Sequence, residues 1–258
     1  MIDIHSHILP GIDDGAVDVS DSLTMLKKAI EDGITTIVAT PHYNIGFMRC
    51  FHNTKENIIK DVEKLKKLVI DNNLEIEIVP GQEIRIHPDL IKDFDEGKIL
   101  PYGLTTKYVL IEFPFTNVPS YANRLLYEIQ QRGFIPVIAH PERCRGLKEQ
   151  PELLFDMIQA GAITQITAAS ILGKFGKETQ IFTQQLIEAD QVHLVATDAH
   201  NTTERSFNLD DAYCFIRDNY GIELVDYYKN NARLLITGNS IDIYDASPIK
   251  KKKKFILF

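Results

Sequence analysis

The sequence predicts an α/β fold in which seven parallel strands alternate with helices and form a distorted (β/α)7 barrel of the TIM type. Short runs rich in isoleucine and valine recur about every 30 residues, and most are followed by an amphipathic stretch with helix-capping residues. Such alternation is typical of a parallel sheet with helical crossovers. A doubly wound open sheet is the alternative, but it usually collects ligands at one switch point rather than at nearly every strand end.

Seven segments have the length and composition of buried strands. They are residues 2–5, 36–39, 76–79, 108–113, 135–139, 163–167 and 193–196. Apolar residues at helical spacing lie between them. The expected helices begin after Ser20 and Thr54, and later ones end near Gly133, Gly161 and Asp190. Further helices complete the chain at its C-terminal end.

Length and charge indicate one globular domain with a basic appendage. The 258 residues are 44% hydrophobic and 25% charged, and the net charge is −8. We expect a barrel over residues 1–246 and a tail over 247–258, which contains five consecutive lysines at 250–254. The acidic body argues against a nucleic-acid surface. Three cysteines, no long apolar run and no signal-like start favour a cytoplasmic protein, with possible peripheral membrane contact through the lysine-rich tail.

Metal-binding residue types follow six of the seven predicted strands. In a parallel barrel the βα loops converge at the C-terminal ends of the strands, so these residues should meet at one rim. His5 and His7 are two positions apart on an extended segment and can therefore chelate one cation. The candidate ligands are His5, His7, Asp14, His42, Glu83, Glu112, His140, Asp198 and His200.

Nine candidate ligands are too many for one ion, so we expect a cluster of two or three. Asp13 and Glu142 are reserve ligands. The set contains no thiolate, which favours Mn, Fe or catalytic Zn over a structural zinc site. Clustered metal ions generate hydroxide at neutral pH and stabilise both oxygens of a displacement at phosphorus.

Two arginines beside the predicted ligands indicate a phosphate substrate. Arg143 lies three residues after His140, and Arg205 lies five after His200. A guanidinium matches phosphate oxygens with two parallel hydrogen bonds. Lys174 and Lys177 follow strand six, where solvent-exposed lysines are the simpler interpretation.

The remaining histidines and the cysteines are not expected to take part in the chemistry. We expect His193 to pack inside the fold, and His52 and His87 to be exposed. A cysteine-based phosphatase needs an arginine six positions after its nucleophile, and neither Cys50, Cys144 nor Cys214 has one. The sequence also has no P-loop or dinucleotide-binding glycine pattern.

The motifs in order resemble the polymerase and histidinol phosphatase (PHP) superfamily, and within it the bacterial manganese-dependent tyrosine phosphatases of the CpsB/CapC capsule type. The likeness extends from Met1 to about Gly238. It is carried by I-D-I-H-S-H-I-L-P-G-I-D-D-G, T-P-H, P-G-Q-E-I-R, L-I-E-F-P, A-H-P-E-R and T-D-A-H.

This resemblance implies the PHP fold, three metal ions and a phosphotyrosine substrate. The implied ligand groups are His5, His7, Glu83 and Asp198; then Glu83, Glu112 and His140; then Asp14, His42 and His200. Arg143 and Arg205 match the phosphate-binding arginines of the family. The implied substrate is the tyrosine-rich tail of a cognate bacterial tyrosine kinase that regulates capsular or other exopolysaccharide export.

Other functions remain open from sequence alone. A small phosphomonoester such as histidinol phosphate fits the same metals and arginines, whereas the acidic body weighs against a nucleic-acid phosphodiester. Amide or ester hydrolysis leaves the arginines unexplained, and a non-enzymatic role in binding a kinase tail leaves the ligand set unexplained. Asp14 or a metal-bound water is a candidate general acid.

Overall fold

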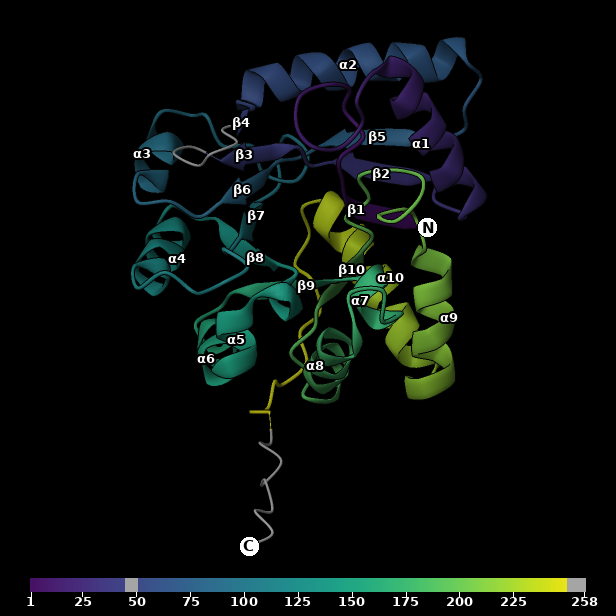
Figure 1. Cartoon of the computed structure of the whole chain (residues 1–258). Coiled ribbons are helices and arrows are strands. Elements are labelled where there is room, and N and C mark those ends of the chain that lie inside the picture. Colours follow the sequence, from purple (N-terminus) through teal and green to yellow (C-terminus); the bar gives the residue numbers. More distant parts are fainter. Residues whose placement is uncertain (45–50, 250–258) are drawn as a thin grey trace, which may run out of the picture.

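The computed structural model describes residues 1–44 and 51–249 of the chain. Its strands form two sheets, one of order β1-β2-β5 and one of order β10-β9-β8-β7-β6-β3-β4, with helices packed around them (Figure 1). The strands are β1 (Ile2–Ser6), β2 (Thr36–Ala39), β3 (His42–Asn44), β4 (Phe51–His52), β5 (Glu77–Pro80), β6 (Glu83–Arg85), β7 (Tyr108–Glu112), β8 (Ile135–Ala139), β9 (Ile163–Thr167) and β10 (Leu194–Ala196).

Two of the seven expected strands are each followed at once by a second short strand, and the strands divide into two sheets at these points. β2 ends before Pro41 and the chain continues as β3, while β5 ends at Pro80 and continues as β6. Proline has no N–H group for the strand ladder, so it favours a break at these points. A Cβ on Gly81 would lie 2.8 Å from Val38 Cγ1, and the chain therefore needs glycine where β5 turns into β6.

Among the described residues the strand pairs are parallel, except that β3 pairs antiparallel with β4. The first and last strands are linked just beyond their ends, where His7 N–H donates to Ala199 O at 2.8 Å and Asp198 N–H donates to His5 O at 2.9 Å. All seven predicted strands are present, and their bounds agree within about one residue. The predicted α/β fold with parallel strands is confirmed.

Helices cover the outside of the strands. They are α1 (Val19–Glu31), α2 (Lys55–Asp71), α3 (Leu90–Asp95), α4 (Ala122–Gln131), α5 (Arg145–Glu149), α6 (Glu152–Gln159), α7 (Ala168–Ile171), α8 (Lys177–Glu188), α9 (Leu209–Tyr220) and α10 (Ile222–Ile236), with a 3-10 turn η1 (Pro141–Arg143). The expected cap at Ser20 is wrong, because Asp18 caps α1 by accepting from Asp21 N–H at 2.9 Å. Thr54 precedes α2 as expected.

Alternate residues of the strands pack into two apolar clusters. Leu110 and Val137 join Tyr102 in the smaller cluster, into which residues of α10 also pack. Their neighbours Ile111 and Ile138 belong to a larger cluster shared with the surrounding helices. Side chains alternate between the two faces of a strand. Residues at the C-terminal ends of the strands that point the same way as Leu110 and Val137 therefore lie close together beyond the smaller cluster.

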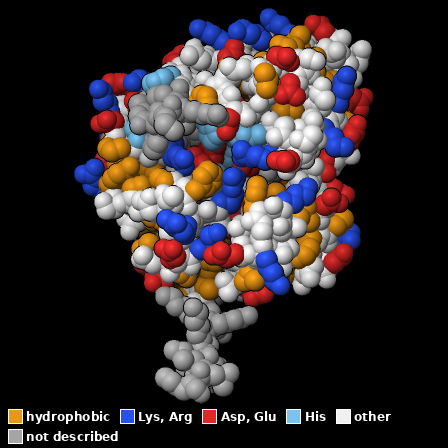
Figure 2. Space-filling model, in the orientation of Figure 1, with side chains coloured by type: hydrophobic (Ala, Val, Ile, Leu, Met, Phe, Trp, Pro, Cys, Tyr) orange, Lys and Arg blue, Asp and Glu red, His pale blue; other side chains and the backbone are white. Residues whose placement is uncertain are grey.

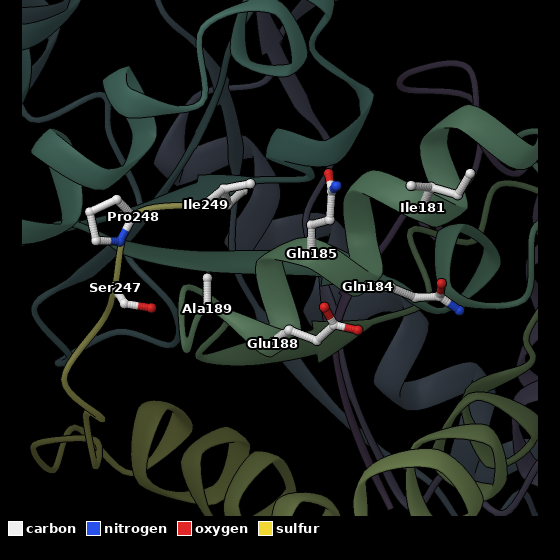
Figure 3. Close-up of a pocket in the computed structure, with 8 residues that line it drawn as sticks. All are labelled: Ile181, Gln184, Gln185, Glu188, Ala189, Ser247, Pro248 and Ile249. Carbon is white, nitrogen blue, oxygen red and sulfur yellow. The ribbon is translucent and has the colours of Figure 1, made fainter. Parts of the chain in front are cut away.

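The end of the described chain packs along α8. Ser247 N–H donates to Ala189 O at 2.9 Å, and Gln191 Nε2 donates to Ser247 O at 2.7 Å. Figure 3 shows Ser247 to Ile249 beside α8, where they border a pocket of about 510 Å³. The lysine run at 250–254 and Cys50 lie outside the described residues. Within the described ranges, no helix is long and apolar enough to cross a membrane.

Candidate active site

The nine predicted ligands meet at the C-terminal ends of the strands. Eight of them form three overlapping groups of side chains whose candidate ligand atoms lie within 4.8 Å of one another, and His140, expected with Glu83 and Glu112, is in none of the groups. The groups are His5, His7, Glu83 and Asp198; His7, Asp14, His42 and His200; and His42, Glu83 and Glu112. Figure 2 shows histidine and acidic side chains together at a hollow on this face, with Lys and Arg side chains beside them.

A bulge in β1 directs two consecutive residues inward. Asp3 pairs with Ile37 and Ser6 with Ala39, so β1 has one more residue than β2 over this span. Ile4 packs in the smaller apolar cluster, and the next residue, His5, reaches the acidic site. Bulges commonly re-aim side chains next to active sites. The sequence predicted only that His5 and His7 share one side, and the bulge is the feature that brings His5 there.

Acceptors behind the ligand atoms fix the orientation of three imidazoles. His5 Nδ1 lies 2.9 Å from Gln165 Oε1, His7 Nδ1 lies 2.8 Å from Asp13 Oδ2, and His200 Nδ1 lies 2.9 Å from the backbone oxygen of Asp198. Each acceptor favours a proton on Nδ1 and leaves the lone pair of Nε2 facing inward. This is the arrangement of metal-binding histidines, whose second nitrogen usually donates to a carboxylate or carbonyl.

The inward-facing atoms suit a shared cation. His5 Nε2 and His7 Nε2 face each other at 3.3 Å. Asp198 Oδ1 and His200 Nε2 are buried without a hydrogen-bond partner among the described residues. Buried acceptors without partners are costly, and a metal ion satisfies several lone pairs at once. The donor set of imidazoles and carboxylates therefore fits bound metal, with Mn, Fe or Zn all compatible by ligand type.

His140 and His42 lie on either side of the Glu83 carboxylate. His140 Nε2 is 2.9 Å from Glu83 Oε1 and 3.7 Å from Glu112 Oε1. His42 Nδ1 is 2.8 Å from Glu83 Oε2, and His42 Nε2 is 3.2 Å from Asp14 Oδ1. Each Glu83 oxygen thus lies beside a histidine, and Glu83, Glu112 and either histidine would be available to hold metal.

The charge states of the site histidines divide into two groups. Burial alone would lower the pKa of His5, His7 and His42, but neighbouring carboxylates raise it, in His42 to about 10, and so favour the protonated form until metal displaces the proton. Burial lowers the pKa of His200 to about 4 and that of His140 to about 4, so both are neutral at pH 7, which is the form that binds metals. Burial alone would raise the pKa of Asp14, but contacts with His200 and His42 lower it below its ordinary range. An ionised Asp14 between two histidines is better suited to binding metal than to acting as a general acid.

Backbone geometry at two ligands departs from the common regions. His140 has φ 31° and Asp198 has φ 55°, both left-handed. Such conformations are uncommon outside glycine and cluster at functional sites, where the surrounding structure holds them in place. Gly15 is required for a different reason. A Cβ there would lie 2.0 Å from His7 O, so the loop that carries Asp13 and Asp14 can approach the end of β1 only with glycine at this position.

The two reserve ligands have other roles. Asp13 accepts from His7 Nδ1, and it also accepts from His42 N–H at 3.1 Å. It therefore holds ligands in place from outside the cluster. Glu142 is fully buried and accepts from Thr167 N–H at 2.9 Å and from the Thr167 hydroxyl at 3.1 Å. It ties the loop after β8 to β9 and does not join the three groups of candidate ligands found among the described residues.

Both predicted arginines lie at the wall of the site. Arg143 Nη1 and Arg205 Nη2 donate to the same oxygen, Asp198 Oδ2, the latter at 2.8 Å. Arg205 Nε is buried and has no hydrogen-bond partner among the described residues. The site opens into a pocket of about 170 Å³ whose lining includes both arginines and six of the candidate ligands. Lys174 and Lys177 are exposed.

The pocket lining includes side chains that sequence reasoning missed. Arg85 donates to Phe113 O at 2.7 Å and lies 3.1 Å from Glu112 Oε2. Its position two residues after Glu83 on one strand was a usable signal, because such residues share a face. Phe51 and Phe115 also line the pocket, and nothing in their local sequence marked them.

Most of the expectations for residues outside the site agree with the structure. His193 is fully buried, His52 is exposed, and Cys144 is buried with its thiol 3.3 Å from Pro114 O. The prediction for His87 was wrong. Its side chain is buried against the Tyr43 ring and lies 3.3 Å from Asp93 Oδ2, because α3 folds back over it.

Residues 1–237 match the family model for capsular polysaccharide synthesis proteins CpsB/CapC. The chain belongs to the CpsB/CapC family. Tyrosine-protein phosphatase YwqE of Bacillus subtilis (strain 168) is 42% identical over 258 residues, which is all of both chains. A putative tyrosine-protein phosphatase CapC of Staphylococcus aureus is 36% identical over 99% of this chain and 98% of the relative.

Solved structures agree with this family assignment. A chain from the crystal structures of YwqE from Bacillus subtilis and CpsB from Streptococcus pneumoniae, described there as unique metal-dependent tyrosine phosphatases, matches with TM-score 0.92 and 42% identity. The match covers 97% of this chain and 100% of the other. Histidinol phosphate phosphatase of Lactococcus lactis matches with TM-score 0.53 at 12% identity, covering 96% and 97% of the two chains, which shows a shared fold alone.

Proposed function

We propose that this CpsB/CapC family member is a metal-dependent protein-tyrosine phosphatase. The observation that carries the proposal is the buried cluster of imidazoles and carboxylates directly beside Arg143 and Arg205 in one pocket. This arrangement combines metal ligands with the side chains best suited to phosphate. Relatives that align over the whole chain are tyrosine phosphatases by name.

We propose manganese as the resident metal, with two or three ions per chain and with iron or zinc as possible substitutes. The three groups of candidate ligands found among the described residues support that number. Bound metal would lower the pKa of water and offset negative charge on the phosphate. His5, His7, Asp14, His42, Glu83, Glu112, His140, Asp198 and His200 would hold the ions.

The arginines would bind the nonbridging oxygens of the phosphoryl group. Each guanidinium carries five N–H donors, and one nitrogen of each contacts Asp198. Arg205 Nε, buried without a partner among the described residues, is a donor available to an anion. Preorganised donors of this kind stabilise charge that develops in a transition state.

The ionised state of Asp14 favours an aryl phosphate. A phenolate leaving group, with a pKa of about 10, needs less help from a general acid than the alkoxide of serine does. Asp14 is the nearest candidate acid from the sequence, but its contacts favour the ionised form. Tyrosine phosphate therefore suits this site better than an alkyl ester such as histidinol phosphate.

We propose that the substrate is a phosphotyrosine protein in the cytoplasm, namely a cognate bacterial tyrosine kinase that controls capsular or other exopolysaccharide synthesis. The family's association with capsular polysaccharide synthesis supports this choice. Nucleic acid is not expected as a partner, because the chain carries a net charge of −8.

The basic tail is proposed to bring the enzyme to the inner face of the membrane. The catalytic unit would comprise residues 1–246 and the tail residues 247–258, with five lysines before a final Phe-Ile-Leu-Phe. Lysines near an anionic surface contribute about 1 kcal/mol each. Removing residues 249–258 should leave hydrolysis of a small aryl phosphate unchanged and weaken binding to anionic vesicles. Equal vesicle binding by both forms at low salt would contradict this role.

A substrate panel tests the proposed activity. Manganese-loaded protein would be assayed with a phosphotyrosine peptide, histidinol phosphate and a phosphodiester, and metal content would be measured for each preparation. We expect the highest kcat/KM for the peptide. A higher kcat/KM for histidinol phosphate would reassign the enzyme to small phosphomonoesters, and phosphodiester cleavage alone would refute the proposal.

A further inference from the structure

Phe115 stands at the wall of the pocket although it is a large apolar side chain. It follows β7 by three residues and keeps 43% of its surface exposed. Among the described residues that line the pocket, Phe51 and Phe115 are the only ones with purely hydrocarbon side chains. Exposing an aromatic ring forgoes hydrophobic stabilisation, so an exposed ring at the mouth of a polar site indicates contact with a ligand.

The surroundings of Phe115 place its ring next to the phosphate-binding groups. The guanidinium carbon of Arg143 lies 4.7 Å from the ring centroid, and that of Arg85 lies 5.6 Å away. The His140 ring is 5.7 Å away, centroid to centroid. The Phe115 ring therefore lies directly beside the groups that are proposed to bind phosphate.

A phosphate ester of tyrosine needs an apolar surface at this point. Its phenyl ring is joined to phosphorus through one ester oxygen, so the ring lies immediately beside the phosphate, whereas a serine ester offers only a methylene group there. Aromatic pairs interact favourably with ring centroids about 4.5–7 Å apart. We propose, on the basis of the tyrosine phosphatase activity proposed above, that Phe115 contacts the aryl ring of the substrate and determines the preference for aryl over alkyl phosphates.

Phe115 has a rival role, which is to hold Arg143 in position. Phe175 allows the two roles to be separated. The guanidinium carbon of Arg143 lies 4.6 Å from the Phe175 ring centroid, almost the same distance as from Phe115. Phe175 is absent from the described residues that line the pocket. A change at Phe175 therefore disturbs Arg143 without altering the pocket wall.

The test compares Phe115→Leu with Phe175→Leu in metal-loaded protein. Calorimetry would give the dissociation constants of phenylphosphonate and inorganic phosphate. Phenylphosphonate carries a phenyl ring on phosphorus, and inorganic phosphate carries an oxygen there instead. Phe115→Leu should weaken phenylphosphonate about tenfold and leave phosphate within about twofold. Phe175→Leu should change both constants in parallel. Phe115→Tyr keeps the ring and should bind phenylphosphonate as the wild type does.

A turnover assay completes the test. The kcat/KM ratio between a phosphotyrosine peptide and the same peptide with phosphoserine should fall about tenfold in Phe115→Leu. Parallel weakening of both anions in Phe115→Leu, or no change in either, would overturn the assignment. A wild type that hydrolyses no phosphotyrosine peptide would refute the proposed function itself. A wild type that hydrolyses it, together with a Phe115→Leu variant of unchanged selectivity, would refute only this inference. Thermal unfolding would confirm that each variant is folded.

Discussion

Replacing Asp13 by asparagine should weaken metal binding without removing a ligand. Both carboxylate oxygens of Asp13 accept hydrogen bonds. Oδ2 accepts from His7 Nδ1 at 2.8 Å and from His42 N–H at 3.1 Å, while Oδ1 accepts from Gly15 N–H at 2.9 Å. An amide has one oxygen and one NH2 group, so in either orientation at least one of these donors faces another donor.

The magnitude follows from the role of Asp13 as an outer partner of a ligand. Removing such a partner typically costs 10- to 100-fold in metal affinity or activity, which is about 1.4–2.7 kcal/mol. Burial alone would raise the pKa of Asp13, but the neighbouring His7 lowers it below its ordinary range, so the group that is lost is an ionised carboxylate. The uncharged amide supports the His7 ring less strongly.

Competition with a chromogenic chelator would measure metal affinity in Asp13→Asn, and kcat/KM for a phosphotyrosine peptide would be measured on the same samples. Asp18→Asn is the matched control, because Asp18 lies in the same loop and asparagine caps a helix as well as aspartate does. Unchanged affinity in Asp13→Asn would refute the reasoning. A loss as complete as in His7→Ala would make Asp13 a direct ligand instead.

Three further predictions follow from the same structure. Arg143→Ala and Arg205→Ala should each lose about 2–4 kcal/mol of transition-state stabilisation, measured as kcat/KM with metals retained. Arg205→Lys should also have a lower kcat/KM than the wild type, because lysine lacks the planar guanidinium. Wild-type kcat/KM in the alanine variants would show that both arginines only form salt bridges. Gly15→Ala should destabilise the protein by at least about 1–3 kcal/mol and reduce bound metal, because the new Cβ meets His7 O; unchanged melting and metal content would contradict the close approach. Burial lowers the pKa of His193 from 6.5 to about 4, so the unfolded chain binds more protons than the folded protein between these pH values. The free energy of unfolding therefore falls as pH drops through this range, and His193→Asn should reduce that fall by up to about 3 kcal/mol in denaturant titrations. The same pH dependence in the variant and the wild type would contradict this role of His193.

The strands and the rim of candidate ligands were predictable from sequence because both depend on local pattern. Ile and Val runs mark buried strands, and parallel topology brings residues such as His42 and Glu83 to one edge whatever the details of packing. The exact placement of the ligand atoms also needed local features that pattern does not predict, such as the bulge in β1 and the left-handed backbone at Asp198. The role of that bulge in directing His5 inward depends on pairing with β2, which a single strand's sequence does not reveal.

Tertiary contacts decided the features that sequence reasoning missed. Burial of His87 depends on α3 folding over it, and the orientation of His5 depends on Gln165, which lies in the middle of a distant strand. Phe115 becomes notable only because Arg143 and Arg85 converge on its ring. Local propensity carries no information on such long-range neighbours.

The most direct test of the account is a metal titration of phosphotyrosine hydrolysis. Protein freed of metal by exhaustive chelation, with metal content verified, would be given increasing manganese while phosphate release from a phosphotyrosine peptide is measured. The three groups of candidate ligands, with His140 beside Glu83, predict no turnover without metal and recovery as two or three ions bind per chain. Full turnover by protein verified to contain no metal would contradict the central claim.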